Sequence, residues 1–226
     1  MTVGIHQPNF LPWIGYFYKI YKSDVFVILD DVQYTKNSFI NRNRIKSPAG
    51  EQWLTMPVLH SGKFGQSINE VDIQFFEKNF KRLKNSLHSN YAKSTYFKEV
   101  MVMFEQFDDF EVKLSSFNEY FIRWILDYLE IKTQIFRSSE LINIEGESTD
   151  RLISICKQLH ADKYLAGFGS KKYQEDDKFL IHGIDNVVYD FTHPQYNQLW
   201  GEFIPNLSII DILFNAGKDT SKIICT

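Results

Sequence analysis

"VGIHQPNFLPWIGYFYKI", residues 3–20, runs almost directly into "DVFVILDDVQY", residues 24–34, and the two stretches together indicate the class of fold. "TVGIH" is apolar enough for a buried strand, "GYFYKIYKS" suits a short helix, and "DVFVILDD" is a second apolar strand. Two strands joined through a helix in this way pair in parallel. The opening of the chain therefore predicts an α/β fold built on a parallel sheet.

The middle of the chain combines a polar segment with helical patterns. Residues 32–50 are polar and basic and contain Pro48 and Gly50, so we expect a long loop there, followed by a strand at "EQWLTMPV". Residues 75–130 repeat apolar side chains at helical spacing, and such stripes are typical of a helical core. The two stripes consist of Phe76, Phe80, Leu83 and Leu87, and of Leu114, Phe117, Phe121, Ile125 and Tyr128.

Alternating strands and helices return after Gly146. We expect a helix at "STDRLISICKQLH", with Ser148 or Thr149 as its N-cap, then a strand at "DKYLAG", a helix near "KKYQEDDKFLIHG" and a strand at "NVVYDF". No linker rich in proline or glycine separates these parts. The sequence predicts one α/β domain over residues 1–226, with a mostly parallel sheet flanked by helices and a helical insertion at residues 75–130.

Composition limits the classes of function. The 226 residues carry a net charge of -3 with a pI near 6.1, so we expect no duplex nucleic acid as partner, because such binding needs a basic surface. Cys156 and Cys225 lack the spacing of metal ligands, and we expect no metal and a reducing compartment. No run approaches the roughly 18 apolar residues of a spanning helix, and no leader pattern opens the chain. We expect a soluble cytoplasmic protein, and the sequence does not indicate its oligomeric state.

Polar residues and glycines follow three of the expected strands. In parallel α/β sheets the ligand crevice lies at the carboxyl ends of the strands, so side chains at these ends meet at one edge. A lone histidine is often structural and paired aspartates often belong to turns, but their shared position favours a common site. The residues are His6 and Gln7 after the first strand, Asp30 and Asp31 after the second, and Gly167 and Gly169 after the later one.

Two further segments suit anionic ligands. In "NRNRIK", Arg42 and Arg44 are planar donors suited to phosphate or carboxylate, and Asn41 and Asn43 add neutral donors. In an extended stretch the alternation would direct both arginines to one side, and the alternative is a solvated basic edge. "GFGSKK", residues 167–172, has the glycines and lysines of a weak phosphate-binding loop, with Lys171 or Lys172 assisting.

Six ordered motifs carry a resemblance to a known family. They are "HQPNFLPWIGYFYKI", "LDDVQYTKNSFINRNRIK", "WLTMPV", "GKFGQSINEV", "YLAGFGSKKY" and "HPQYNQLWGEFIPNLSIIDILFNAG". Together they resemble the WbqC-like family over nearly the whole chain. This sequence departs from the family pattern at Phe10, where tyrosine is common, and at Asn197, where proline is expected.

The resemblance implies a role in making bacterial O-antigen or related surface polysaccharide. It implies a transferase that N-acylates an amino sugar carried on a nucleotide, with glycyl among the candidate acyl groups. The acyl donor stays open between acyl-CoA, aminoacyl-tRNA and ATP with a free acid. By chemical type, His6 is the candidate base, with Asp30 or Asp31 as its orienting group or as an alternative base.

The expected substrate-binding residues suit a nucleotide-linked sugar. Arginines and lysines would hold its pyrophosphate, aromatic rings would stack on its rings, and Asn9 or the backbone near Gly169 would stabilise an oxyanion. "HPQYNQLWGEF" is polar and aromatic, and we expect it near His6, the alternative being a surface turn held by Pro194. The full set is Gln7, Asn9, Trp13, Tyr34, Asn41, Arg42, Asn43, Arg44, Lys63, Gly167, Gly169, Lys171, Tyr173, His193, Gln195 and Tyr196.

Two other functions fit the same residues. The opening strand and "HQPNFLPWIG" are loosely similar to the first crossover of the nucleotidylyltransferase-like proteins, although the paired His-x-x-His is missing, and this alternative implies ATP binding or adenylate formation. A non-catalytic subunit that binds a sugar nucleotide would use the same strand ends. A glycosyltransferase is disfavoured because "LDD" lacks the Asp-x-Asp pattern of a metal-held sugar nucleotide.

Overall fold

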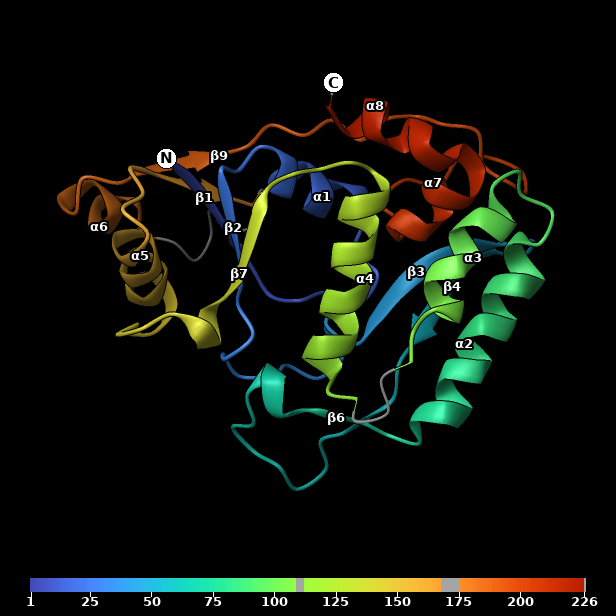
Figure 1. The fold of residues 1–226 in the computed structure, drawn as a ribbon, viewed down its shortest axis with the longest axis horizontal. Helices are drawn as coiled ribbons and strands as arrows, with labels where there is room; N and C mark the ends of the chain where they lie inside the picture. The colour runs from blue at the N-terminus through green and yellow to red at the C-terminus, as the bar shows by residue number, and fades with distance from the viewer. Residues whose placement is uncertain (109–111, 168–174, 226) are drawn as a thin grey trace. The chain divides into compact units, whose positions relative to one another are not determined.

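The computed structural model describes residues 1–108, 112–167 and 175–225 (Figure 1). By compactness the chain divides into two units, which are described one at a time. The first comprises Met1–Gln7, Gly15–Asp31 and Lys132–Thr192, and the second Pro8–Ile14, Val32–Ile131 and His193–Thr226. The expected single domain over residues 1–226 stays a prediction.

A five-stranded parallel sheet forms the centre of the first unit, which confirms the predicted α/β class. Figure 1 shows β7, β2 and β1 side by side within this unit. Each neighbouring pair of strands runs in parallel. For β1 and β2 the connection through α1 predicted this pairing. In spatial order the strands are β7 (Gln134–Arg137), β2 (Val25–Ile28), β1 (Thr2–His6), β8 (Lys163–Ala166) and β9 (Asp185–Val188).

The two faces of this sheet take different helices. Val3, Ile5, Val25 and Val27 belong to one apolar cluster with residues of α5 (Ser148–Gln158) and α6 (Asp176–Ile181). Side chains alternate along a strand, so Phe26 faces the opposite side, where its ring meets Tyr16 of α1 (Ile14–Tyr21) edge-on at 5.4 Å. The helix at "STDRLISICKQLH" is confirmed, but its N-cap is Glu147 and not Ser148 or Thr149.

Gly4 lets Ser23, in the segment after α1, lie close to the sheet. A Cβ built at this position would overlap Ser23 Oγ and come within 2.9 Å of Phe26 Cδ2. We expect Gly4→Ala to lower the free energy of unfolding by about 1–3 kcal/mol, because overpacking forces neighbouring groups to shift. Chemical denaturation measures the loss. Gly167→Ala is the matched control, since a Cβ there meets nothing within 4 Å, and an equal loss in both variants would contradict the packing argument.

The chain reverses its direction of growth across the sheet between β1 and β8. From β1 it adds β2 and then β7 on one side, and afterwards β8 and β9 on the other. The chain therefore continues from β1 toward one edge of the sheet and from β8 toward the other. Ligands of open parallel sheets bind in the crevice outside such a switch point, at the carboxyl ends of the strands. His6 ends β1, so it lies at this position of the sheet.

Two small antiparallel sheets belong to the second unit. β3 (Arg42–Ser47) and β4 (Gly50–Thr55) form a hairpin in which Arg44 lies opposite Trp53. The expected loop at residues 32–50 is therefore wrong for its second half. The predicted strand at "EQWLTMPV" is present as β4, and β5 (Val58–Leu59) pairs with β6 (Asp72–Ile73).

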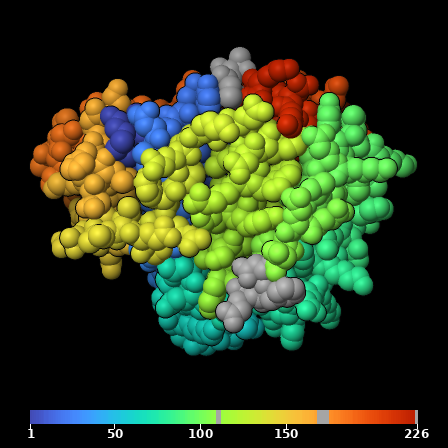
Figure 2. Space-filling view, in the orientation of Figure 1, coloured from blue at the N-terminus to red at the C-terminus, as the bar shows by residue number. Residues whose placement is uncertain are grey.

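The segment expected to be helical forms α2 (Phe76–Tyr91), α3 (Phe97–Glu105) and α4 (Leu114–Tyr128) of the second unit. α7 (Ile209–Ala216) and α8 (Thr220–Cys225) belong to the same unit. The predicted stripes are largely buried, which confirms them as core: the buried members are Phe80, Leu83, Leu87, Leu114, Phe117, Phe121 and Ile125. α2 and α3 form the green surface in Figure 2.

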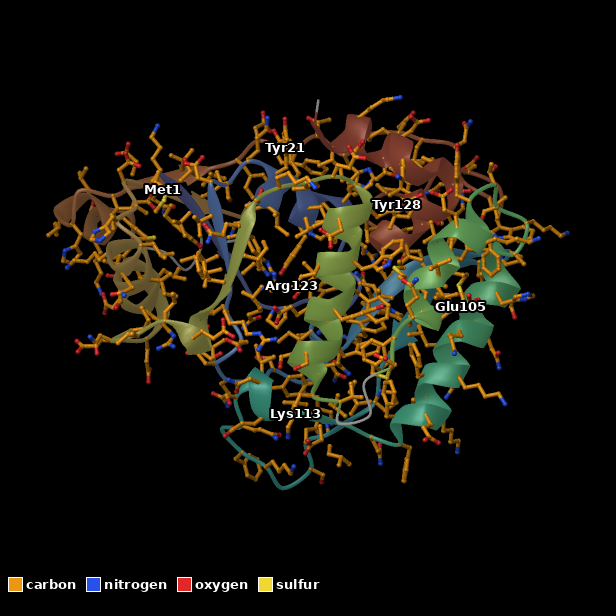
Figure 3. The ribbon with its side chains drawn as sticks, viewed as in Figure 1. Met1, Tyr21, Glu105, Lys113, Arg123 and Tyr128 are labelled. Carbon is orange, nitrogen blue, oxygen red and sulfur yellow. The ribbon has the colours of Figure 1, made fainter. Side chains whose placement is uncertain are left out.

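Polar contacts join the two ends of α4 to other parts of the second unit, and an ion pair lies within the helix. Lys113, just before the helix, pairs with Asp72, and Tyr128 at its end donates a hydrogen bond to Glu99 Oε1 over 2.9 Å. Midway, Arg123 Nε pairs with Glu119 Oε1 at 2.7 Å. Figure 3 labels Lys113, Arg123 and Tyr128 along this helix. Across the described ranges, no helix combines the length and apolar character needed to cross a bilayer.

Candidate functional site

His6 lies at the carboxyl end of β1 with one ring nitrogen already bonded. Its Nδ1 lies 3.0 Å from the Gln7 carbonyl oxygen, and since a carbonyl only accepts, Nδ1 carries the proton. Tyr16 Oη donates to the same carbonyl over 3.2 Å, and its ring meets the imidazole edge-on at 5.0 Å. Nε2 then holds a lone pair, and within the described residues it forms no hydrogen bond.

The environment keeps the His6 ring neutral. The pKa of His6 is lowered from 6.5 to about 4, mainly by burial and also by the nearby Lys19, while the bond to Gln7 acts in the opposite direction. At neutral pH the imidazole is therefore an acceptor at Nε2. A neutral ring with a fixed tautomer is suited to receive a proton from a substrate.

Lys19 is a second basic group at this edge, and the sequence reasoning missed it. It is 1% exposed, and its Nζ donates to the Ile5 carbonyl oxygen over 2.6 Å. Burial lowers its pKa from 10.5 to about 7, with a smaller opposing effect from Cys156. The signal in the sequence was a lysine between Phe17 and Ile20 on the apolar side of a short helix.

Asp30 and Asp31 bind groups of their own chain. Asp30 accepts hydrogen bonds from Ser138 Oγ at 3.1 Å, Ser139 N at 3.0 Å and Ser139 Oγ at 2.7 Å. Asp31 accepts from Ser138 Oγ at 2.5 Å and pairs with Arg151 of α5. These bonds tie the end of β2 to the turn after β7. Within the described residues neither carboxylate bonds to His6, so their roles as base or orienting group stay predictions.

Four of the candidate residues in and after the predicted phosphate loop lie outside the described residues: Gly169, Lys171, Lys172 and Tyr173. Gly167 is described and follows β8 directly. Among the residues that the structure describes, no three histidine, cysteine, aspartate or glutamate side chains gather as metal ligands would.

Arg42 and Arg44 lie on one side of the β3–β4 hairpin, as the alternation predicted. The Arg42 guanidinium carbon lies 4.5 Å from the centroid of the Trp53 ring, and that of Arg44 lies 5.9 Å from it. Arg42 Nη2 also donates to the Asn37 carbonyl over 2.5 Å, and Arg44 Nη1 pairs with Glu51 at 3.0 Å. Within the described ranges, the two Nε atoms are buried and have no hydrogen-bond partner. Trp53 is 47% exposed, so this face of the hairpin is open to solvent.

The asparagines of the same motif hold the backbone. Asn41 Nδ2 donates to Met56 O over 3.1 Å, and Asn43 Nδ2 donates to Leu11 O over 2.7 Å. Both side chains are buried, as is Asn9 in the loop after β1. The backbone of Trp13 forms a bridge with Ser208. These contacts give Asn41 and Asn43 a structural role in the second unit.

Tyr34 and Lys63 occupy different surroundings. Among the residues that the structure describes, Tyr34 Oη is buried without a hydrogen-bond partner. Burial raises the pKa of this phenol, while Arg42 lowers it. Lys63 Nζ pairs with Asp72 at 3.3 Å on the surface. Tyr34 is therefore the better placed of the two for a ligand contact near Arg42.

The segment "HPQYNQ" connects to a buried polar network of the second unit. Tyr196 Oη donates to Asp211 Oδ1 over 2.9 Å, and Tyr91 Oη donates to Asp211 Oδ2 over 2.7 Å. Gln198 Oε1 accepts from Lys46 Nζ over 3.0 Å. His193 Nδ1 bonds to the Pro194 carbonyl at 2.8 Å. Gln195 is exposed.

The predicted site residues fall into both units. His6, Gln7, Asp30, Asp31 and Gly167 belong to the first. Convergence of the two groups, including the expected approach of "HPQY" to His6, stays a prediction. The described members of the second unit are Asn9, Trp13, Tyr34, Asn41, Arg42, Asn43, Arg44, Lys63, His193, Gln195 and Tyr196.

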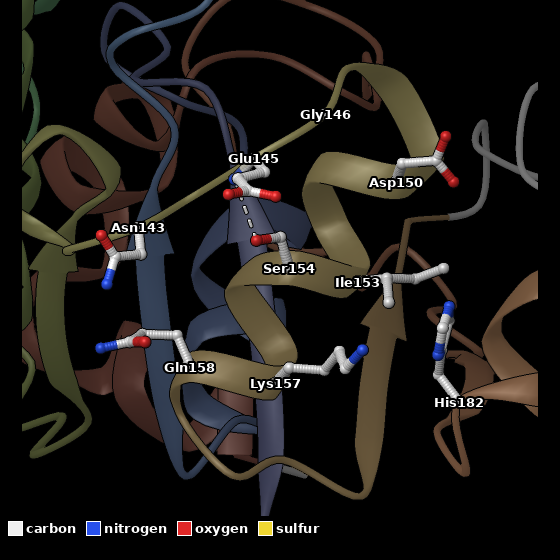
Figure 4. A pocket seen from close by; sticks show the side chains of 9 residues that line it. All are labelled: Asn143, Glu145, Gly146, Asp150, Ile153, Ser154, Lys157, Gln158 and His182. Carbon is white, nitrogen blue, oxygen red and sulfur yellow. Dashed lines mark hydrogen bonds between the residues drawn. The ribbon is translucent and has the colours of Figure 1, made fainter.

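A hollow of about 540 Å³ lies beside α5 in the first unit (Figure 4). Its wall is stabilised by a hydrogen bond from the Glu145 backbone N–H to Ser154 Oγ at 3.0 Å. Acidic and basic groups both line it, so its charge favours no ligand class. The lining residues are Asn143, Glu145, Gly146, Asp150, Ile153, Ser154, Lys157, Gln158 and His182.

Comparison with known proteins places the chain in a family. An uncharacterised protein of Mycobacterium tuberculosis is 36% identical over 220 residues, covering 96% of this chain and 94% of that protein. No solved structure matches the chain. The model of the WbqC-like protein family matches residues 7–223, which is nearly the whole sequence. The chain belongs to the WbqC-like protein family.

Proposed function

We propose that the chain is a transferase that N-acylates an amino sugar carried on a nucleotide, in the synthesis of a bacterial surface polysaccharide. The observation that carries the proposal is His6: a neutral imidazole at the carboxyl end of β1, with Nδ1 held by Gln7 and an unbonded Nε2. The acyl donor is acyl-CoA, aminoacyl-tRNA, or ATP with a free acid, and nucleotide substrates place the reaction in the cytoplasm.

The proposed chemistry needs one proton transfer in which His6 takes part. The amine of the sugar attacks the acyl carbonyl carbon, and its nitrogen becomes strongly acidic as the new C–N bond forms. The bond from the acyl carbon to its carrier then breaks, which releases the thiol of CoA, the hydroxyl of tRNA or, from an acyl adenylate, AMP. A weakly basic neutral imidazole is then able to accept the proton at Nε2. The positive charge that develops lies in a buried environment, so a counter-charge from the substrate would assist the step. Arg42 and Arg44 remain the proposed ligands of the nucleotide pyrophosphate.

His6→Ala is expected to lower turnover by about 10²–10⁴-fold while nucleotide-sugar affinity changes little, since general base catalysis contributes about that factor. Mass spectrometry follows acyl transfer onto amino-sugar nucleotides with acetyl-CoA, or with glycine and ATP, as donor. Calorimetry measures the affinity. His160→Asn, at an exposed histidine of the same unit, is the control and is expected to retain activity. Loss of nucleotide-sugar affinity in His6→Ala, with no acyl transfer by the unmutated protein onto any substrate tried, would instead favour a non-catalytic sugar-nucleotide binding protein.

A second candidate is an ATP-binding, adenylate-forming enzyme of the nucleotidylyltransferase-like type. The strand order favours it, because the sheet has its switch point directly after the first strand, where doubly wound folds bind nucleotide phosphates. Exchange of pyrophosphate into ATP that depends on a free acid such as glycine would support this activity. Exchange that is absent with every acid tried, together with transfer from acetyl-CoA, would exclude it.

A further inference from the structure

The Lys19 ammonium is buried without a counter-charge. Its contacts are the Ile5 carbonyl oxygen at 2.6 Å and the face of the Tyr164 ring, whose centroid lies 5.6 Å away. Throughout the described part of the chain, no carboxylate pairs with it. An ammonium offers three N–H donors, and only one of them is used here. Among the described residues, the fold therefore keeps a basic amine with unused hydrogen-bond donors in its interior.

The position of this ammonium is set by the gap between β1 and β8. The register joins Gly4 to Leu165 and then stops, although β8 continues to Ala166. The His6 carbonyl accepts from Leu29 of the β2 side, so the preceding carbonyl, that of Ile5, points toward β8. Lys19 Nζ donates to the Ile5 carbonyl at this point, beyond the last paired residues of β1 and β8. The ammonium thus lies at the switch point, near the carboxyl ends of the strands.

The groups around Lys19 give it no negative charge. His6 on β1 is neutral at pH 7, and burial raises the pKa of the Cys156 thiol on α5 to about 12, so it stays protonated. The remaining neighbour is the phenol ring of Tyr164 on β8. An unpaired buried ammonium is costly, and a methionine of similar length would avoid that cost. A lysine at this place is explained by an anion that binds to it.

We propose that Lys19 Nζ, in the gap between the carboxyl ends of β1 and β8, binds the phosphate of a small phosphorylated ligand. The flexible four-carbon stem lets the ammonium turn from the Ile5 carbonyl toward the crevice, where the ligand enters. The phosphate supplies the missing counter-charge and uses the spare donors. The inference concerns binding and holds whether or not the chain transfers an acyl group.

Calorimetry with UDP, glucose 1-phosphate and inorganic phosphate tests the site. Lys19→Met is expected to weaken binding by about tenfold or more, the effect of losing a charge-assisted hydrogen bond. UDP binding without glucose 1-phosphate binding identifies a nucleotide phosphate, and the converse identifies a sugar phosphate. Lys22→Met is the control, because Lys22 lies one residue after α1 and its ammonium contacts only the rings of Tyr18 and Tyr21 among the described residues. Equal affinity of Lys19→Met and the unmutated protein for all three probes would overturn the proposal.

Stability without ligand separates a binding role from a structural one. If Lys19 serves the anion, Lys19→Met is at least as stable as the unmutated protein in the absence of phosphate, and phosphate no longer raises its Tm. If Lys19 serves only the Ile5 carbonyl, the variant is less stable and phosphate raises the Tm of both proteins equally, which contradicts the proposal.

Proton uptake by the unmutated protein gives a test that needs no variant. Sulfate carries the charge of the ligand but does not titrate near neutral pH. The pKa of Lys19 is about 7 without anion, so at about pH 8 most of the amine is neutral. A bound anion raises that pKa, and sulfate binding should take up close to one proton per chain. Calorimetry in buffers of different ionisation enthalpy measures the uptake, and binding of sulfate without it would reject the site.

Discussion

Phe117→Ala is expected to lower the free energy of unfolding by about 3–5 kcal/mol, the usual cost of removing a large ring from a packed core. Phe117 of α4 is fully buried in the second unit. Its ring lies 4.9 Å from that of Phe121, 5.2 Å from that of Phe107 and 5.8 Å from that of Phe80, each edge-on. Truncation leaves a cavity and removes all these ring contacts together.

Urea denaturation followed by tryptophan fluorescence measures this loss. Phe64→Ala is the matched control, since Phe64 is 100% exposed and its truncation should change the free energy of unfolding by less than about 0.5 kcal/mol. A loss below about 1 kcal/mol for Phe117→Ala would mean that the ring cluster is not the centre of the core. The free energy of unfolding of the Phe117→Leu variant should lie between those of Phe117→Ala and the unmutated protein, because leucine restores part of the lost volume.

The parallel sheet could be predicted because its strands show their burial directly in the sequence. β1 and β2 are short apolar runs joined by a helix, and β8 repeats the pattern. β7 was missed because "QIFR" is four residues long and only half-buried. The segment is a strand because it pairs with β2, which lies more than a hundred positions earlier in the chain. No local pattern contains that pairing.

β3 was missed for a different reason. Its buried positions include Asn43 and Lys46, so the apolar alternation that marks a strand is broken. Those polar groups are tolerated because backbone carbonyls of Leu11 and Glu202 accept their hydrogen bonds. Both partners lie far away along the chain. The same argument explains why the aspartates at the end of β2 looked unpaired in the sequence.

Lys19 shows the limit of assigning roles by residue type. A lysine on a short amphipathic helix is usually solvated, with its stem over apolar neighbours and its charge in water. Here Phe26 of β2 packs against Tyr16 of the helix, and the ammonium lies inside, bonded to the Ile5 carbonyl of β1. The placement of His6 at the end of β1 could be predicted, because parallel topology fixes where strands end.

The buried network around Asp211 should be the most sensitive polar feature of the second unit. Asp211 of α7 is fully buried and accepts from Tyr91 and Tyr196. The Lys46 ammonium is buried near it and bonds to Gln198. Asp211→Ala is expected to cost about 3–5 kcal/mol of unfolding free energy, because both phenols lose their acceptor and Lys46 loses its counter-charge. Asp211→Asn keeps one acceptor and should cost clearly less.

The pH dependence of unfolding gives this network a second test. Burial raises the pKa of Asp211 above 3.8, while its hydrogen bonds from Tyr91 and Tyr196 and the charge of Lys46 act in the opposite direction. The folded state therefore holds the proton more tightly than the unfolded chain, and the stability linked to that proton is lost as the pH rises through the folded pKa. Asp211→Asn cannot titrate there. The advantage of the unmutated protein over Asp211→Asn should thus shrink as the pH rises above about 4, the ordinary pKa of an aspartate. Denaturation curves from about pH 4 upward measure this difference in the free energy of unfolding. Asp127→Asn, at an exposed aspartate of α4, is the control. An advantage that grows with pH would show that pairing with Lys46 outweighs desolvation, and that the carboxylate is held ionised in the folded protein.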